Sequence, residues 1–324
     1  MLIDLIALLG LLPGPPLHLF ACGFTSKSYV VGAPLPPSGL FALSGAGEWA
    51  QTGFNHPNIA AADFDPRHPD VLYLAAGNGC IRASAREGWR ILTDWRVTEV
   101  QDVSLDTARE GHIYIALPDG IAFSGDGGRT WTRRERGLPR KFAQTIQVDR
   151  TRAGRVIAGT EKGIFVSTDE GGEWRQAGAA GLLITDVEQS QSEPRRWMAT
   201  AQAGGLFAST DNGASWPAVP ALAGRTLYNV SLDPHRALRA ATCGWSEGVL
   251  VSEDGGVTWA DRSAGLPSRR VWRVSFDPGQ ENRLWASVHE EAVFVSDDLG
   301  RTWRRSGLEG SIIRDFVFVP GGSR

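Results

Sequence analysis

Four acidic residues of this 324-residue chain stand in short turns between apolar stretches and could together form a hydrolytic site: Asp119, Glu161, Glu247 and Glu290. Two carboxyl groups that flank a sugar ring can hydrolyse a glycosidic bond, at a separation of about 5 to 5.5 Å in retaining enzymes and about 6.5 to 9.5 Å in inverting ones. If the fold brings two of these turns together, they are the pool from which a glycoside hydrolase would draw its catalytic pair.

A second set of residues could bind a ligand without catalysing a reaction. Its members are arginines, tryptophans, one lysine and one histidine in the same turns or in nearby linking segments: Trp95, Arg96, Arg140, Lys141, Arg225, Trp245, Arg269, Arg270, Trp272 and His289. Tryptophan offers a large amphipathic contact surface, and arginine pairs with carboxylates in a fixed geometry. This composition suits a glycan or a segment of another protein as partner, and a solvated rim without a ligand is the alternative.

The elements that must position these residues follow from a repeated motif, S-x-D-x-G-x-[T/S/E]-W, which we call the Asp-box. Its five full copies contain Asp126, Asp169, Asp211, Asp254 and Asp298, and two shorter copies without the aspartate lie at 44–49 and 84–89. The serine and aspartate can bond to the backbone of their own turn, and glycine tolerates a positive φ. The motif therefore predicts a structural turn, followed by a tryptophan that packs between neighbouring units.

The spacing of the motif predicts the fold. The seven serines of the full and shorter copies lie 40 to 44 residues apart, and each repeat contains four runs with the period-two alternation of β-strands. A repeat of this length with four strands is typical of a propeller blade. We therefore expect an all-β, seven-bladed β-propeller of four-stranded antiparallel blades, formed by residues 28–324.

The ring is expected to close with strands from both ends of the chain. The first repeat has strand patterns at 28–33, at 40–44 and from Trp49, but no innermost strand before them. Residues 311–320 match the innermost-strand pattern and have no further strands after them. We predict that they pair with 28–33 and so remove the open sheet edge.

The up-and-down course of a blade also predicts two different faces. The Asp-boxes share one face with the Asp-Pro turns, whereas the turns between second and third strands and the links between blades share the other, which we call the funnel face. All the acidic and binding candidates above belong to the funnel face.

Composition argues against several classes of function. The net charge is -3, so the chain lacks the basic field that draws nucleic acid. Its three cysteines, Cys22, Cys80 and Cys243, form no CxxC pair, and its six histidines have no metal-binding spacing. We expect no metal, no cofactor and a monomer.

Residues 1–27 form a separate apolar segment in this interpretation. The run from Leu2 to Leu12 is too short to span a bilayer, so no transmembrane helix is expected. The run resembles the core of an export signal, and 19–22 looks like a lipobox with Cys22 as a possible lipid anchor. This favours export or the cell envelope, with the cytoplasm as the alternative. Asp4 inside the run and the lack of a preceding basic residue argue against export, and a docked N-terminal helix or a misplaced start is the alternative.

The Asp-boxes, with phrases such as 64–73 (FDPRHPDVLY) and 265–267 (GLP), give residues 28–320 a resemblance to known propellers. The chain resembles the sialidase, sortilin and xyloglucanase-like Asp-box (BNR-repeat) propellers, and it is similar in layout to photosystem II assembly-factor propellers. The resemblance implies the fold more strongly than the activity.

The enzymes of this group imply features that the chain lacks. Sialidases resembling it have six blades, an early Arg-Ile-Pro motif and a late tyrosine nucleophile, whereas this chain has no Arg-Ile-Pro and no tyrosine after Tyr228. Xyloglucanase-like enzymes place one carboxylate on each of two propellers, and only one propeller is expected here. The resemblance thus favours a non-catalytic binding or assembly module, with a glycoside hydrolase as the alternative.

Overall fold

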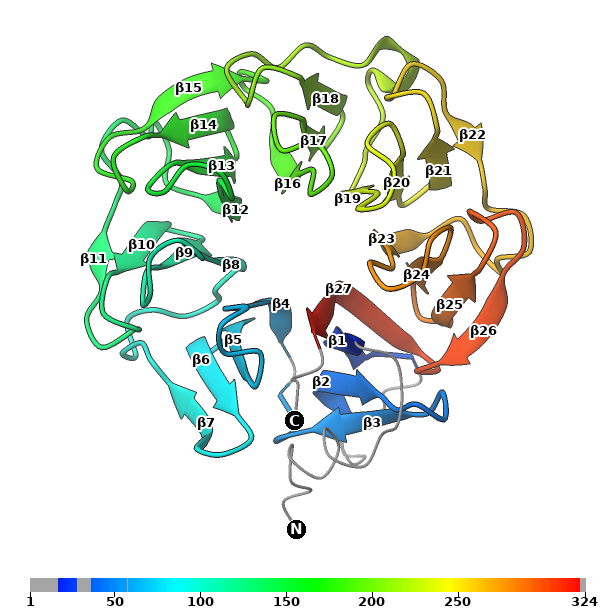
Figure 1. Cartoon of the computed structure of the whole chain (residues 1–324), viewed down its shortest axis with the longest axis horizontal. Helices are drawn as coiled ribbons and strands as arrows, with labels where there is room; N and C mark the ends of the chain where they lie inside the picture. Colours follow the sequence, from blue (N-terminus) through cyan, green and yellow to red (C-terminus); the bar gives the residue numbers. More distant parts are fainter. Residues whose placement is uncertain (1–16, 28–35, 57, 321–324) are drawn as a thin grey trace.

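The computed structural model describes residues 17–27, 36–56 and 58–320. Its strands form seven antiparallel sheets, arranged as blades around a central axis (Figure 1). The only helix in the described part of the chain is a short 3-10 helix, η1 (Pro220–Leu222). The predicted all-β, seven-bladed propeller is confirmed.

The blades are numbered along the chain, and the strands of each blade follow one another from the axis outward. Blade 1 contains β27 (Ser311–Pro320), β1 (Leu17–Thr25), β2 (Ser38–Leu43) and β3 (Trp49–Thr52). Blade 2 contains β4 (Ile59–Phe64), β5 (Val71–Ala76), β6 (Gly79–Ser84) and β7 (Gly88–Ile91). Blade 3 contains β8 (Asp102–Leu105), β9 (Ile113–Leu117), β10 (Gly120–Ser124) and β11 (Thr132–Arg133).

Blades 4 to 7 continue the same order. Blade 4 contains β12 (Ala143–Val148), β13 (Val156–Thr160), β14 (Gly163–Ser167) and β15 (Arg175–Gly178). Blade 5 contains β16 (Ile184–Gln189), β17 (Trp197–Ala201) and β18 (Gly205–Ser209). Blade 6 contains β19 (Asn229–Leu232), β20 (Ala240–Gly244), β21 (Gly248–Ser252) and β22 (Ala260–Asp261), and blade 7 contains β23 (Val271–Phe276), β24 (Leu284–Val288), β25 (Ala292–Ser296) and β26 (Arg304–Gly307).

Blade 5 departs from the predicted four strands. Its outer edge is reduced to a single bridge between Phe207 and Ala218. The segment that would form the fourth strand contains Pro217 and Pro220. Proline has no N–H to donate to a sheet, so a regular ladder cannot continue along this segment.

The ring closes in blade 1 as predicted, but with a different partner strand. The C-terminal strand β27 pairs antiparallel with β1, from Leu17 opposite Pro320 to Thr25 opposite Ser311. The prediction that 28–33 is the partner of β27 was wrong. Residues 28–33 lie outside the described residues. The apolar pattern had suggested a separate N-terminal segment of residues 1–27. The nine residues of β1 belong instead to the sheet of blade 1.

The position of β1 also bears on the lipid-anchor prediction. Cys22 lies inside β1 between β27 and β2, and its side chain is fully buried. Burial, followed by the charge of Asp315, raises the pKa of its thiol, which makes the sulfur a poor nucleophile. A lipoprotein signal is cleaved before its acylated cysteine. Cleavage before Cys22 would remove the first five residues of β1, so a lipid anchor at Cys22 is incompatible with the full strand that the structure shows. Among the described residues, no helix has the length and hydropathy to cross a membrane.

The core lies between the blades. Buried apolar side chains form a cluster at each interface of neighbouring blades, for example Val251 of blade 6 with Phe276 of blade 7. Because each sheet packs against two others, both of its faces are apolar. The blades are thereby held at fixed angles around the axis.

The Asp-boxes form the turns that the sequence predicts. In the copy of blade 6, Ser252 Oγ donates to Asp254 Oδ1 at 2.9 Å and accepts from the N–H of Gly256 at 2.8 Å. The N–H of Thr258 donates to Asp254 Oδ1 at 2.9 Å. The other four copies repeat the serine–aspartate and serine–glycine bonds. These polar groups are engaged within their own turns.

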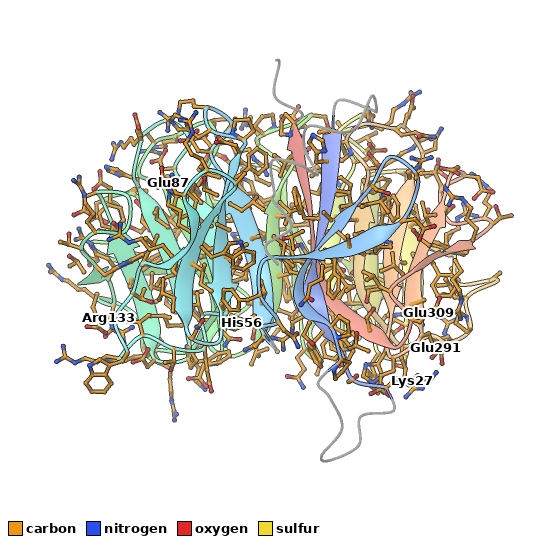
Figure 2. All side chains as sticks on the ribbon, turned by 90° about the horizontal axis from the view of Figure 1, so that it is seen from below. Lys27, His56, Glu87, Arg133, Glu291 and Glu309 are labelled. Atoms are coloured by element: carbon orange, nitrogen blue, oxygen red, sulfur yellow. The ribbon has the colours of Figure 1, made fainter. Side chains whose placement is uncertain are left out.

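Figure 2 shows the two faces of the ring in side view. Glu87, in the shorter Asp-box copy of blade 2, lies toward one face. Lys27 and Glu291 lie at the opposite, funnel face, where they form an ion pair of 3.2 Å.

Candidate functional site

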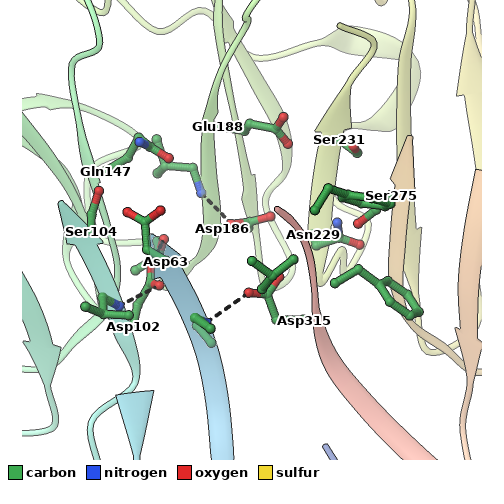
Figure 3. A pocket seen from close by; sticks show the side chains of 18 of the residues that line it. Asp63, Asp102, Ser104, Gln147, Asp186, Glu188, Asn229, Ser231, Ser275 and Asp315 are labelled. Carbon is green, nitrogen blue, oxygen red and sulfur yellow. Dashed lines mark hydrogen bonds between the residues drawn. The ribbon is translucent and has the colours of Figure 1, made fainter. Parts of the chain in front are cut away.

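A channel of about 930 Å³ follows the axis of the ring and is lined by the innermost strands of the blades. Because successive side chains of a strand alternate, every second residue of an innermost strand faces the channel. The layer nearer the funnel face is formed by Ala61, Asp102, Thr145, Asp186, Asn229, Arg273 and Asp315, and the layer two residues further along by Asp63, Ser104, Gln147, Glu188, Ser231, Ser275 and Val317. Figure 3 labels most of the polar members of these layers.

Many of these side chains also hold neighbouring blades together. An innermost strand is a sheet edge, so its unpaired N–H groups need acceptors. The acceptors come from the preceding blade: Asp315 for Ala62, Asp102 for Ile146, Asp186 for Val230, Asn229 for Val274, Asp63 for Leu105, Ser104 for Val148 and Ser231 for Phe276, at 2.8 to 3.2 Å. The carboxylates are therefore fixed in orientation around the channel.

The charges in the channel are unevenly paired. Arg273 contacts Asp315 at 2.8 Å and Asp186 at 3.4 Å, and these carboxylates raise its pKa despite its burial. Burial raises the pKa of Glu188 to about 8, with a further contribution from Asp186. Burial likewise raises the pKa of Asp102 to about 7 and that of Asp63 to about 6, although backbone hydrogen bonds oppose the effect.

The structure brings four of the predicted binding residues together on blades 6 and 7. Trp245 lies edge-on to Trp272 and to His289, with ring centroids 6.1 and 4.7 Å apart, and Arg270 lies over the Trp245 ring at 5.4 Å. Tyr228, which was not among the predicted residues, stacks on Trp272 at 4.6 Å. Tyr228 and Trp272 also line the channel. We call these five residues the aromatic rim.

Two other predicted binding residues, Arg225 and Arg269, lie in the links that lead into blades 6 and 7 and are already paired. Arg225 contacts Glu247 at 2.6 Å. Arg269 contacts Asp261 at 2.7 Å and donates to the backbone carbonyls of Ser246 and Glu247. Their charges are thus compensated within the fold, and the exposed apolar surface beside them belongs mainly to Trp245, which is 39% exposed.

The remaining binding candidates lie on other blades. Trp95 is 82% exposed in the link between blades 2 and 3, where Arg96 stacks on it at 5.3 Å. Arg140 and Lys141 lie in the link between blades 3 and 4, where Lys141 contacts Glu135 at 2.6 Å. None of these four lines the channel.

The four carboxylates predicted as a catalytic pool are distributed over blades 3, 4, 6 and 7. Asp119 pairs with Arg133, Glu247 with Arg225, and Glu290 accepts from Ser26 Oγ at 2.8 Å. Glu161 is half-buried in the turn between β13 and β14. None of the four is among the residues that line the channel. In residues 17–27, 36–56 and 58–320, no group of three His, Cys, Asp or Glu side chains could hold a metal ion.

The channel carboxylates were missed because site candidates were sought only in turns. Their signal was in the strands themselves: Asp102, Asp186, Arg273 and Asp315 occupy the same position in four of the innermost strands, and Asp63 and Glu188 occupy the position two residues further along. In a propeller that strand lines the axis, so charges at this place face the channel.

Comparison with solved structures supports the fold. The chain matches the GH74 xyloglucanase from Xanthomonas campestris with a TM-score of 0.64 at 18% identity, over 76% of this chain and 45% of the enzyme. It matches YCF48 bound to D1 peptide with a TM-score of 0.59 at 16% identity, over 76% of this chain and 80% of that protein. YCF48 from Cyanidioschyzon merolae gives a TM-score of 0.55 at 16% identity, over 75% and 83%.

These similarities show a shared fold. The chain spans less than half the length of two GH74 enzymes that it matches, 45% of the Xanthomonas campestris xyloglucanase and 38% of an ancestral GH74 enzyme. No protein-family model and no curated protein matches its sequence.

Proposed function

We propose that this propeller is a binding module that captures a segment of another protein on its funnel face. The observation that carries the proposal is the aromatic rim at the mouth of the channel. Five side chains with large flat surfaces converge there from two blades, and one of them, Trp245, remains substantially exposed. Tryptophan, tyrosine and arginine are the residues that most often dominate protein interfaces.

The architecture supports a binding module over a hydrolase. The YCF48 structure that contains a bound peptide is matched over most of its length, as expected for a protein of one similar ring. The Xanthomonas campestris xyloglucanase and the ancestral GH74 enzyme are matched over less than half of their lengths. The four funnel-face carboxylates lie on separate blades, and three of them are paired with other side chains.

Selection from a random peptide library tests the proposal. The immobilised full chain should enrich peptides, and the double variant Trp245→Ala/Trp272→Ala should lose at least about 90% of this capture. Trp95→Ala is the matched control because it removes an exposed tryptophan from a different blade, and it should retain capture. Equal loss in the control, or no enrichment by the wild-type chain, would refute a peptide site at the aromatic rim.

A glycan array and a hydrolysis assay on xyloglucan, run on the same proteins, examine the alternatives. Glycan binding that is lost in a Trp272 variant would indicate that the partner is a glycan and not a protein segment. Xyloglucan hydrolysis that is lost when Glu161 or Glu247 is replaced by glutamine would indicate that the protein is a glycoside hydrolase and not a binding module. We expect neither.

A further inference from the structure

The channel behind the aromatic rim is lined by more acidic than basic side chains. Five carboxyl groups line it, and among the described residues Arg273 is the one arginine that lies within 4.0 Å of any of them, namely Asp186 and Asp315. The other two arginines in the lining hydrogen-bond to neutral groups: Arg150 donates to the Gln189 carbonyl at 2.6 Å and Arg314 to Asn58 Oδ1 at 3.0 Å. From a greater distance, the charge of Arg150 partly offsets the burial that raises the pKa of Asp63 and Glu188. In the part of the chain that the structure describes, Asp63, Asp102 and Glu188 have no cationic partner within 4.0 Å.

Two of these three carboxyl groups, those of Asp102 and Asp63, are held in place by hydrogen bonds. Asp102 accepts from the Ile146 N–H at 2.9 Å and from Thr145 Oγ1 at 2.8 Å, and Asp63 accepts from the Leu105 N–H at 2.8 Å. Figure 3 shows Glu188 projecting into the same space from β16. A positive charge that enters the channel would therefore meet oriented acceptors that need little rearrangement.

The mouth of the channel suits the same kind of ligand. Tyr228 and Trp272 line the channel at its funnel end, and aromatic rings attract cations through their faces and pack against alkyl chains. A volume of about 930 Å³ is ample for one long side chain with water around it. The observed charges and the aromatic mouth thus complement a long side chain with a cationic end.

We propose that the channel takes the ammonium or guanidinium group of a basic residue in the captured segment and pairs it with Glu188 and Asp102. This inference rests on the proposed function and adds to it the chemistry of the residue that is recognised. Because burial raises the pKa of both carboxyl groups, arrival of the cation also releases protons to the buffer.

A small cation tests the channel without any peptide. The probe is n-pentylammonium, and the uncharged control ligand is 1-pentanol. Pentylammonium should raise the Tm of the wild-type chain, whereas pentanol should not. The shift should fall by more than half in the double variant Glu188→Gln/Asp102→Asn, which keeps the side-chain volumes. Glu193→Gln removes an exposed carboxylate outside the channel and should leave the shift unchanged. No shift, or an equal shift in the double variant, overturns the inference.

Peptide selection separates this inference from the proposed function. The wild-type chain should enrich peptides with lysine or arginine at one position, and replacement of that residue by norleucine should weaken binding about tenfold. The double variant should still capture peptides but bind the lysine and norleucine forms equally. Peptides selected without a basic preference would overturn the channel inference and leave the binding module standing. If pentylammonium raises the Tm but no peptide is captured, the proposed peptide-binding function and the recognition of a basic residue are both overturned. The channel would then still bind small cations.

Discussion

The indole N–H of Trp272 donates a hydrogen bond of 2.7 Å to Nδ1 of His289, which ties the inner strand of blade 7 to a turn of the same blade. For Nδ1 to accept, the imidazole must be neutral and carry its proton on Nε2. Trp245 packs on the same imidazole at 4.7 Å. The arrangement of the aromatic rim therefore depends on the protonation state of one histidine.

We predict that the contribution of His289 to stability is lost in mild acid. Burial lowers the pKa of His289, Arg270 lowers it further, and Glu290 opposes them. The folded state therefore binds fewer protons than the unfolded state, whose histidine pKa is about 6.5. The contribution is present above about pH 6.5 and declines as the pH falls through the lowered pKa. The difference in free energy of unfolding between wild type and His289→Gln should shrink from pH 7.5 to pH 5. A constant difference for His289→Gln over this pH range would contradict the prediction.

The channel carboxylates should affect stability in the opposite direction. The pKa values of Glu188 and Asp102, about 8 and about 7, lie above those of the unfolded chain. The folded state therefore binds more protons, and the stability that this provides is present below about pH 4 and is lost as the pH rises toward 8. Glu188→Gln should stabilise the fold by about 1 to 2 kcal/mol at pH 8, less than the full shift because channel water screens the charge. Its effect should nearly vanish at pH 5. Urea unfolding at both pH values measures this, with Glu193→Gln as control, and a destabilised variant at pH 8 would count against it.

The Asp-box should matter through its buried serine. Ser252 Oγ accepts the buried N–H of Gly256, so Ser252→Ala leaves that donor without a partner and should cost about 1 to 3 kcal/mol. Ser246→Ala, at an exposed turn of the same blade, should cost less than about 0.5 kcal/mol. Equal stability of the two variants in denaturant melts would show that the motif does not hold its turn.

The tryptophan of the motif should contribute according to its burial. Trp174 is 2% exposed and donates to the carbonyl of Arg134 in the preceding blade at 2.9 Å, so Trp174→Ala should cost about 3 to 5 kcal/mol. Trp259 and Trp303 are only partly buried, and their replacement should cost less. Thermal unfolding of the three variants tests the order, and a larger loss for Trp303→Ala than for Trp174→Ala would reverse it.

The sequence predicted the ring well because its repeats are local. Each Asp-box bonds within itself, so the motif is visible in eight residues, and the regular spacing of seven copies implies the blade count. The partner of β27 could not be found this way. Leu17–Thr25 has few charges and reads like the continuation of an apolar leader, and only its pairing with a strand nearly 300 residues away reveals it as part of a sheet.

The candidate site was predictable in part for a related reason. Trp245, Arg270, Trp272 and His289 were selected because they belong to turns and links of one face, and they meet because blades 6 and 7 are consecutive. The ion pairs of the other candidates could not be predicted from the sequence. The contacts of Arg225 with Glu247 and of Arg133 with Asp119 depend on how each turn folds back on its blade.

The final prediction concerns the closure of the ring by β27. This strand pairs with β1 along its whole length, and its side chains Ile313 and Phe316 are buried against blade 7. A protein that ends at Gly310 would expose the edge of β1 and the apolar faces of both neighbours, so we expect it to aggregate or to unfold in one cooperative step at a much lower temperature. A protein that ends at Pro320 keeps β27 and is the matched control, with an unchanged Tm. Light scattering and thermal unfolding of the two proteins give the answer. A monomer that lacks β27 and melts like the control would mean that the ring does not need this strand, because blade 1 would then be stable with an open inner edge.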